Sequence, residues 1–312
     1  MDKNSQRIIF MGTPEISATV LEGLISAGYN VVAVIAQPDR PVGRKKVLMP
    51  VPTKVIAEAH QIPVYQPLKI RKEYEFVKEL KPDVIITLAY GQIVPQGLLD
   101  IPTLGCINLH GSLLPKYRGA DPIQYALMNN ETETGMTLMK MVKEMDAGEM
   151  YAVEKVTIDP NDNATSLFKK MGDAALKLIL RELPKYLKGE LPGVAQDESL
   201  VTFAPSIKPE EEKLDLVKSK EELHGYIRAL SDVPGAYLFH GESKLKIYRS
   251  EIVSSEIKGE VGEIIQADKK GLYLQTKNGI LSLLELQPEG KKRMDYLSFI
   301  NGHPHLVGTK LQ

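Results

Sequence analysis

Short apolar runs alternate with amphipathic segments along the first half of the chain. The apolar runs predict buried strands at 7–11, 31–36, 63–66, 84–88 and 106–110. Helical spacing and capping residues predict helices at 13–28, 53–60 and 71–80. Continuous apolar strands separated by helices are typical of a parallel sheet that helices cover on both faces. The first domain is therefore expected to be α/β, with a Rossmann-like, mostly parallel sheet.

The pattern changes after about residue 190. Up to that point we expect two more strands at 136–141 and 150–158, and a helix at 165–187 that Gly189 ends. Beyond it, one helix is expected at 219–230. Short β-like runs follow at 236–240, 244–253, 261–267, 271–276 and 280–286. Turn residues separate these runs, including the hairpin signal Lys277-Asn278-Gly279.

Several short strands at this spacing favour a small antiparallel barrel of the OB-like kind. The sequence thus predicts an α/β domain followed by a β-barrel domain. We place the first domain at 1–189, an exposed linker at 190–207 and the second domain at 208–312.

The composition is that of a globular protein and narrows the function only slightly. Of 312 residues, 43% are hydrophobic and 25% are charged, and the formal net charge is -1, so the chain has no overall positive field for nucleic acid. Cys106 is the only cysteine, which excludes an internal disulfide and a cysteine-rich metal site. No apolar run approaches the ~20 residues of a membrane-spanning helix, and the N-terminus has no apolar signal region. We expect a cytoplasmic monomer with no metal and no membrane partner.

The turn after the first predicted strand is a candidate ligand site, because ligands of open parallel sheets bind beyond the carboxyl ends of the strands. Gly12 is followed by Thr13-Pro14-Glu15, which replaces the second glycine of a dinucleotide-binding fingerprint. A tight structural turn is expected here, with Thr13 as the cap of the next helix. This disfavours a nicotinamide-dependent oxidoreductase.

A polar pair ends the fifth predicted strand. Asn108 and His110 are two residues apart, so their side chains share a face. An amide beside an imidazole suits an oxyanion that develops on a carbonyl carbon. The structural alternative is an asparagine that caps a loop and a histidine bonded to backbone. Asp146, in the polar turn 143–149, would join this pair and orient the ring only if the turn folds back beside His110.

One segment is strongly basic within this neutral chain. Residues 40–54 contain no acidic side chain and five basic ones, namely Arg40, Arg44, Lys45, Lys46 and Lys54. The prolines and the glycine in and around this segment predict that it is neither helix nor strand. It is either a solvated loop or an extended loop that contacts phosphates.

Several segments match known motifs, of which the most specific is INLHGSLLPKYRG at 107–119, the signature of formyltransferases. That signature also occurs in enzymes acting on glycinamide ribonucleotide, formyltetrahydrofolate or sugar nucleotides. Narrower matches are FMGTP (10–14), QPDRPVGRKKVLMP (37–50), MDAGEM (145–150), LHGYIRALSDVPGAY (223–237), KRM (292–294) and VGTKL (307–311). With these, the chain resembles the methionyl-tRNA formyltransferase family over nearly its whole length.

The resemblance implies a reaction and its residues. A formyl group would pass from 10-formyltetrahydrofolate, as co-substrate, to the α-amino group of methionyl-initiator tRNA, for translation initiation and without a metal. It implies that Asn108, His110 and Asp146 are catalytic. It implies that folate binds at Ser112, Leu113, Leu114 and Pro115, and tRNA at Arg40, Arg44, Lys45 and Lys46.

The resemblance also implies that residues 208–312 contact tRNA, although this segment holds 16 Lys and Arg against 16 Asp and Glu. Asp121 is a departure, since the family commonly has alanine there. Two other functions are compatible with the residues. One is a folate-dependent N-formyltransferase acting on a sugar-nucleotide amine. The other is a non-catalytic RNA-binding protein, which the presence of Asn108, His110 and Asp146 together disfavours.

Overall fold

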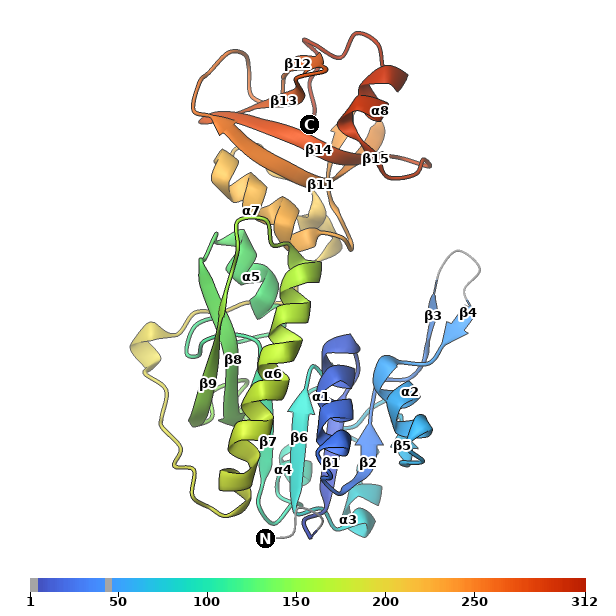
Figure 1. Cartoon of the computed structure of the whole chain (residues 1–312), viewed down its shortest axis with the longest axis vertical. Helices are drawn as coiled ribbons and strands as arrows, with labels where there is room; N and C mark the ends of the chain where they lie inside the picture. Colours follow the sequence, from blue (N-terminus) through green and yellow to red (C-terminus); the bar gives the residue numbers. More distant parts are fainter. Residues whose placement is uncertain (1–4, 43–46) are drawn as a thin grey trace. The chain divides into compact units, whose positions relative to one another are not determined.

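A seven-stranded sheet in the order β5-β2-β1-β6-β7-β8-β9 forms the centre of the first half of the chain (Figure 1). The computed structural model describes residues 5–42 and 47–312. The strands are β1 (Ile8–Gly12), β2 (Val31–Ile35), β5 (Val64–Tyr65), β6 (Val84–Leu88), β7 (Cys106–His110), β8 (Glu133–Lys140) and β9 (Met150–Thr157). From β5 to β7 neighbouring strands are parallel, and β8 is antiparallel to β7. The predicted mostly parallel sheet is confirmed.

Helices cover both faces of the parallel part of this sheet, which explains why the strands of that part are almost continuously apolar. On one face lie α1 (Glu15–Ser26) and α6 (Ala164–Leu187), which pack closely where Gly23 meets Leu176. On the other face lie α3 (Phe76–Leu80) and α4 (Gln96–Leu99), whose buried side chains join those of Ile9, Ile85 and Cys106 in one core. The buried Cys106 thiol has its pKa raised to about 12 by desolvation.

The start of α1 differs from the prediction. Thr13 does not cap the helix, because its hydroxyl donates a hydrogen bond of 3.0 Å to the Tyr90 carbonyl, and Pro14 occupies the cap position. The expected helix at 71–80 is reduced to α3, and α2 (Pro52–Ala59) agrees with the helix expected at 53–60.

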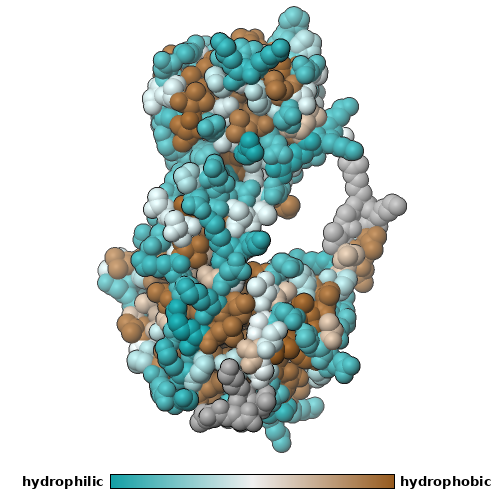
Figure 2. All heavy atoms as spheres, in the orientation of Figure 1, coloured by the Kyte–Doolittle hydropathy of each residue, from teal (hydrophilic) through white to brown (hydrophobic). Residues whose placement is uncertain are grey.

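The basic segment forms a strand pair, so the prediction that its prolines and glycine exclude strands was wrong. β3 (Arg40–Val42) and β4 (Val47–Met49) form a separate two-stranded sheet, with Pro41 opposite Leu48. Both strands of such a ribbon are edge strands, and an edge strand tolerates a residue without an N–H. Hydrophobic side chains gather on the exposed part of the hairpin (Figure 2), where Val47, Leu48 and Met49 are all about half exposed.

The second half of the chain contains an antiparallel sheet in the order β10-β11-β14-β13-β12, with β15 beside β14. These are β10 (Ala236–His240), β11 (Ser243–Ser254), β12 (Ile264–Asp268), β13 (Gly271–Thr276), β14 (Gly279–Pro288) and β15 (Met294–Asp295). The last residues of the chain bond to both edges of the sheet: Gln312 pairs with Phe239, and Leu311 donates to the Gly262 carbonyl. The closed sheet confirms the predicted barrel, with α8 (Tyr296–Gly302) as a helix that the sequence pattern did not predict.

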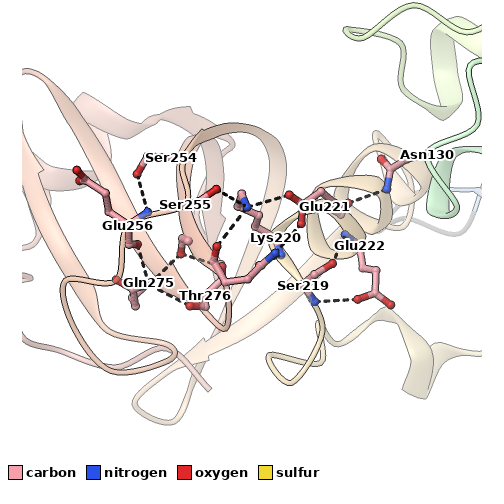
Figure 3. Close-up of polar contacts among 12 residues, drawn as sticks. Asn130, Ser219, Lys220, Glu221, Glu222, Ser254, Ser255, Glu256, Gln275 and Thr276 are labelled. Carbon is pink, nitrogen blue, oxygen red and sulfur yellow. Dashed lines mark hydrogen bonds and ion pairs between the residues drawn. The ribbon is translucent and has the colours of Figure 1, made fainter.

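Helix α7 (Lys220–Leu230) is anchored to this sheet by a buried lysine (Figure 3). The Lys220 ammonium lies 2.8 Å from a Glu221 carboxylate oxygen, 3.3 Å from the Ser255 hydroxyl and 3.2 Å from the Asn278 carbonyl. The hydrogen bond from Lys220, followed by that from Asn278, holds the pKa of Glu221 at about 2. The predicted Asn278-Gly279 hairpin therefore fixes the start of the helix.

Two compact units interleave along the chain. Segments 1–119, 134–157 and 168–204 form one unit, and segments 120–133, 158–167 and 205–312 form the other. The second unit thus includes α5 (Pro122–Met128), which packs against α7. Asp121, the departure from the family pattern, accepts a hydrogen bond of 2.8 Å from the Ile207 backbone within this unit. The boundaries at 189 and 208 stay a prediction.

Within the described ranges, no helix has both the length and the apolar character to cross a membrane.

Candidate active site

Strand β7 ends at the carboxyl edge of the sheet with Asn108 and His110 on one face. This is the face of Cys106, which packs towards α3 and α4. In the sheet, Asn108 lies between Thr87 of β6 and Met139 of β8. The strand therefore presents the amide and the imidazole together, as its alternation predicts.

The His110 ring is held between two protein groups. Its Nε2 lies 2.9 Å from the Tyr117 carbonyl oxygen, and its Nδ1 lies 3.6 Å from Oδ1 of Asp146. Because a carbonyl oxygen can only accept, Nε2 carries a proton. The side chain of His110 is 5% exposed and that of Asp146 is 15% exposed. The pair is thus largely shielded from water, and the ring is fixed in orientation.

The turn that carries Asp146 folds back beside His110, as the catalytic hypothesis requires. Asp146 adopts a positive φ of 52°, and its Oδ2 accepts a hydrogen bond of 2.9 Å from the Gly119 N–H. A Cβ at Gly148 would lie 1.9 Å from the Lys140 carbonyl oxygen. Glycine is therefore required for this turn to approach β8 so closely.

The Asn108 amide has no hydrogen-bond partner among the residues that the structure describes, and it is half-buried. The hydroxyl of Thr87, its neighbour on β6, is buried and also lacks a partner in the described part of the chain. An unpaired amide at a strand end is free to donate to a bound carbonyl oxygen. One half of the structural alternative, an asparagine that caps a loop, is not found among the described residues. Its other half, a histidine bonded to backbone, is present in the contact between His110 and the Tyr117 carbonyl.

The proposed folate segment divides into buried and accessible side chains. Ser112 is fully buried, and its hydroxyl donates to the Lys116 carbonyl at 2.6 Å. Leu114 is also buried, and its N–H donates to the Thr137 hydroxyl. The side chains of Leu113 and Pro115 are half-buried and therefore accessible in part. A ligand would contact these two side chains, and the other two residues only through their backbone.

A cavity of about 320 Å³ opens beyond the carboxyl ends of β1, β2 and β6. It is lined by Thr13, Pro14, Gln37, Arg40, Met49, Pro50, Val51, Pro52, Ala89, Tyr90 and Gly91. Thr13 and Gln37 both donate to the Tyr90 carbonyl and so tie the three strand ends together. Burial raises the pKa of the Tyr90 hydroxyl. Sequence reasoning took the Gly12-Thr13 turn as a structural turn and predicted no cavity there, although the motif FMGTP at 10–14 could have pointed to one.

Of the four predicted tRNA contacts, Arg40 is exposed and borders this cavity. Arg44, Lys45 and Lys46 lie outside the described residues. Lys54, the fifth cation of the basic segment, forms an ion pair of 2.6 Å with Asp39, and that hydrogen bond raises the pKa of Lys54. Its charge is thus neutralised locally.

No group of three potential metal ligands of the His, Cys, Asp or Glu type occurs in the ranges 5–42 and 47–312.

Known proteins resemble this chain over both halves. Residues 6–183 match the family described as Formyl transferase, and residues 206–304 match Formyl transferase, C-terminal domain. Methionyl-tRNA formyltransferase of Bacillus mycoides (strain KBAB4) is 46% identical over 308 residues, 98% of each chain, and that of Bacillus cereus (strain B4264) is equally similar.

Solved structures share the fold at lower identity. HypX from Aquifex aeolicus in complex with tetrahydrofolic acid is 16% identical, with a TM-score of 0.65 over 95% of this chain and 47% of that one. An N-formyltransferase from Helicobacter canadensis, in complex with folinic acid and dTDP-3-aminofucose, is 19% identical with a TM-score of 0.66, over 88% of this chain and 98% of that one. Sequence identity is high to the two Bacillus enzymes and low to these solved structures. This chain therefore belongs to the formyl transferase family and, within it, to the methionyl-tRNA formyltransferases.

Proposed function

We propose that this protein transfers the formyl group of 10-formyltetrahydrofolate to the α-amino group of methionine esterified to initiator tRNA. The observation that carries the proposal is the 46% identity to methionyl-tRNA formyltransferases across 98% of the chain, including the second domain. A sugar-nucleotide acceptor is the second candidate. Its support is a likeness of fold at 19% identity or less.

The nucleophile is the free α-amino group, whose ordinary pKa of ~7.7–8.0 leaves part of it neutral at pH 7. A new bond forms between this nitrogen and the formyl carbon, the bond from that carbon to N10 of the folate breaks, and one proton moves from the amine to N10. The tetrahedral intermediate carries a negative oxygen. Stabilising this oxygen, rather than creating the nucleophile, is the main task of the site.

Asn108 is assigned as the direct donor to this oxygen, because its amide has no partner elsewhere in the described chain. His110 is assigned a different task from direct donation, since its Nε2 proton already bonds to the Tyr117 carbonyl. The ring instead packs beside the Asp146 carboxylate, with Nδ1 3.6 Å from Oδ1, and helps to fix its position. Asp146, directly or through a held water, accepts the proton from the attacking amine.

Folate and the methionyl end of the tRNA are proposed to approach Asn108, His110 and Asp146 from different sides. Leu113 and Pro115 border the folate with their side chains, and Ser112 and Leu114 do so with their backbone. The cavity beyond β1, β2 and β6 accepts the methionyl end, because Pro14, Met49 and Val51 give it an apolar lining that suits a thioether side chain. Arg40, at the border of this cavity, is proposed to contact a phosphate. Arg44, Lys45 and Lys46, which lie outside the described residues, are proposed as further tRNA contacts.

The second domain is proposed to contact tRNA through a localised surface, because its charge is balanced overall. A cavity of about 570 Å³ there is lined by cationic, imidazole and aromatic side chains that include Lys244, Lys291, His303 and Phe299. The His303 ring stacks on Phe299 with centroids 4.2 Å apart. Phe299 is buried, so His303 is the partly accessible ring of this pair. Lysines beside an accessible ring are a combination with which barrels of this kind bind nucleic acid.

The test compares acceptors for labelled 10-formyltetrahydrofolate. We expect formyl transfer to methionyl-initiator tRNA and none to an amino-sugar nucleotide. Transfer to the sugar nucleotide without transfer to tRNA would overturn the proposal. Methionyl-elongator tRNA is included to measure how strongly the enzyme discriminates between the two tRNAs.

The same assay tests the basic hairpin. Replacing Arg40, Arg44, Lys45 and Lys46 by glutamine should raise the KM for tRNA and flatten its dependence on salt. Fewer phosphate contacts would form, so tRNA binding would release fewer counterions. The matched control replaces Lys81 and Lys188, exposed lysines that follow α3 and α6 at the amino edge of the sheet. If the variant of the basic segment had the same KM and salt dependence as that control, the assignment of these residues as tRNA contacts would be wrong. The assignment of the enzymatic activity would not be affected.

A further inference from the structure

The segment 194–204 runs past the two turns that hold the His110–Asp146 pair. Its Val194 exchanges two backbone hydrogen bonds with Met150, and its Ala204 donates to the Arg118 carbonyl. Arg118 in turn donates its N–H to the Thr202 carbonyl at 2.9 Å. The segment follows α6 and belongs to the same compact unit as the catalytic strand.

Gln196 is the side chain of this segment that reaches the Asp146 turn. Its Nε2 donates to the carbonyl of Asp146 at 2.6 Å and to that of Gly148 at 2.8 Å. Its Oε1 accepts a hydrogen bond of 3.0 Å from Nε of Arg118. The amide is 9% exposed, and these bonds use both of its donors and its acceptor. No other rotation of the amide would satisfy the same three partners.

Arg118 extends the link to the other turn. The Arg118 side chain is almost fully buried, and its guanidinium forms two hydrogen bonds with the exposed carboxylate of Glu198. The residue before it supplies the carbonyl that holds His110, and the residue after it supplies the N–H that binds Asp146. Tyr117, which precedes it, has a positive φ of 61°, as Asp146 does at 52°. Backbone of this kind persists only where its surroundings fix it.

We propose that Gln196, acting with Arg118, is a positioning residue that sets the distance and orientation between Asp146 and His110. The inference rests on the proposed function of that pair. Gln196 touches only protein groups, and its effect on the reaction passes through the Asp146 turn. Displacing a catalytic carboxylate by about 1 Å costs up to ~100-fold in rate.

The test substitutes the amide with an apolar group of similar length. Gln196→Met should lower kcat by about 10- to 100-fold, with the KM for tRNA and for 10-formyltetrahydrofolate within about twofold of wild type. Gln196→Glu keeps an acceptor for Arg118 and loses both donors to the turn, so it should lower kcat at least as much. Glu198→Gln is the matched control, since this exposed carboxylate bonds to Arg118 from outside, and its kcat should stay within about twofold.

A double-mutant cycle with Asp146→Asn separates positioning from a general structural role. If Gln196 acts through Asp146, Gln196→Met should reduce kcat by less than about twofold once Asp146 is replaced. A full, independent loss in the double variant would overturn the proposal, and so would a kcat of wild-type size in Gln196→Met. If Gln196→Met does not fold, the same cycle run with Gln196→Glu decides.

Failure of the proposed function has a different signature, because the wild-type protein itself would then transfer no formyl group to methionyl-tRNA.

Discussion

The amide of Asn108 stands at the point where the formyl carbonyl is proposed to lie, and its neighbour on β6 provides a control. Asn108→Ala removes a donor to the oxyanion and should lower kcat by at least ~100-fold, with the affinity for folate nearly unchanged. Single-turnover transfer of labelled formyl to methionyl-initiator tRNA measures the first effect, and fluorescence titration with folate measures the second.

Thr87→Val changes an adjacent side chain of the same face without touching the amide. Because the Thr87 hydroxyl is buried and unpaired within the described residues, replacing it by a methyl group should leave folding stability unchanged or slightly higher. Its kcat should stay within about twofold of wild type. If both variants lost activity equally, the loss at Asn108 would reflect disturbed packing at the strand end, and its catalytic assignment would be withdrawn.

At the residue scale, alternation along a strand was enough to place Asn108 and His110 side by side. The sequence could say only that Asp146 would join this pair if its turn folded back. Whether the turn does so depends on the close approach at Gly148 and on the hydrogen bonds from Gln196. Gln196 itself lies in a segment that was assigned to a linker. Its three hydrogen bonds involve residues 48 to 78 positions away, and no local pattern carries such information.

The element α7 carries a histidine that makes the second unit sensitive to acid. Desolvation, followed by the nearby charge of Arg228, lowers the pKa of His224 to about 4, and its Nδ1 lies 3.0 Å from the Ser250 hydroxyl of β11. The unfolded chain has the ordinary histidine pKa of ~6.5, so between these values it binds more protons than the folded chain. Stability is therefore lost as the pH falls from about 6.5 towards about 4.

His224→Gln should remove this part of the pH dependence. Between pH 7.5 and pH 5.0 the wild-type free energy of unfolding should fall by about 2 kcal/mol more than that of the variant, at roughly 1.4 kcal/mol for each pH unit below 6.5. Urea unfolding at the two pH values measures the difference. Equal losses in the two proteins would mean that His224 is as easily protonated in the fold as in the unfolded chain.

At the element scale, long apolar strands and the helix α6 were predictable from periodicity and caps. Elements with few residues could not be predicted in this way. The helix α4 has four residues, too few for a periodic pattern, and the β3–β4 hairpin contains prolines that usually argue against strands. A two-stranded ribbon has no central strand, so that rule does not apply to it.

At the scale of the whole molecule, the order of segments along the chain does not follow the compact units. The first family match ends at residue 183 and the second begins at residue 206, and the predicted linker at 190–207 overlaps this interval. In space, α5 and residues 158–167 belong with the second unit. A Cβ added at Gly225 of α7 would lie 2.7 Å from the carbonyl oxygens of Leu127 and Met128, so the helices α5 and α7 touch almost backbone to backbone. Sequence patterns reveal the two fold types and miss this exchange of segments.

A chain ended at residue 204 would keep α5 and lose α7, and we expect it to fold incompletely. The buried α5 side chains Ile123, Leu127 and Met128 would be exposed, and burying each contributes about 1.5–3 kcal/mol. The carbonyls of Asp159 and Asp162 would also lose their hydrogen bonds from Arg228.

The fragment 1–204 should therefore bind the dye ANS, unfold at a lower temperature than the full chain and be cleaved by protease within 120–133 and 158–167. Adding the separately produced fragment 205–312 should reverse all three effects, because it restores α7 to α5. A fragment 1–204 that resists protease at those segments and melts at the temperature of the full chain would show that these segments fold with the first domain. In that case the boundary predicted at 189 would describe the folding units better than the spatial division does.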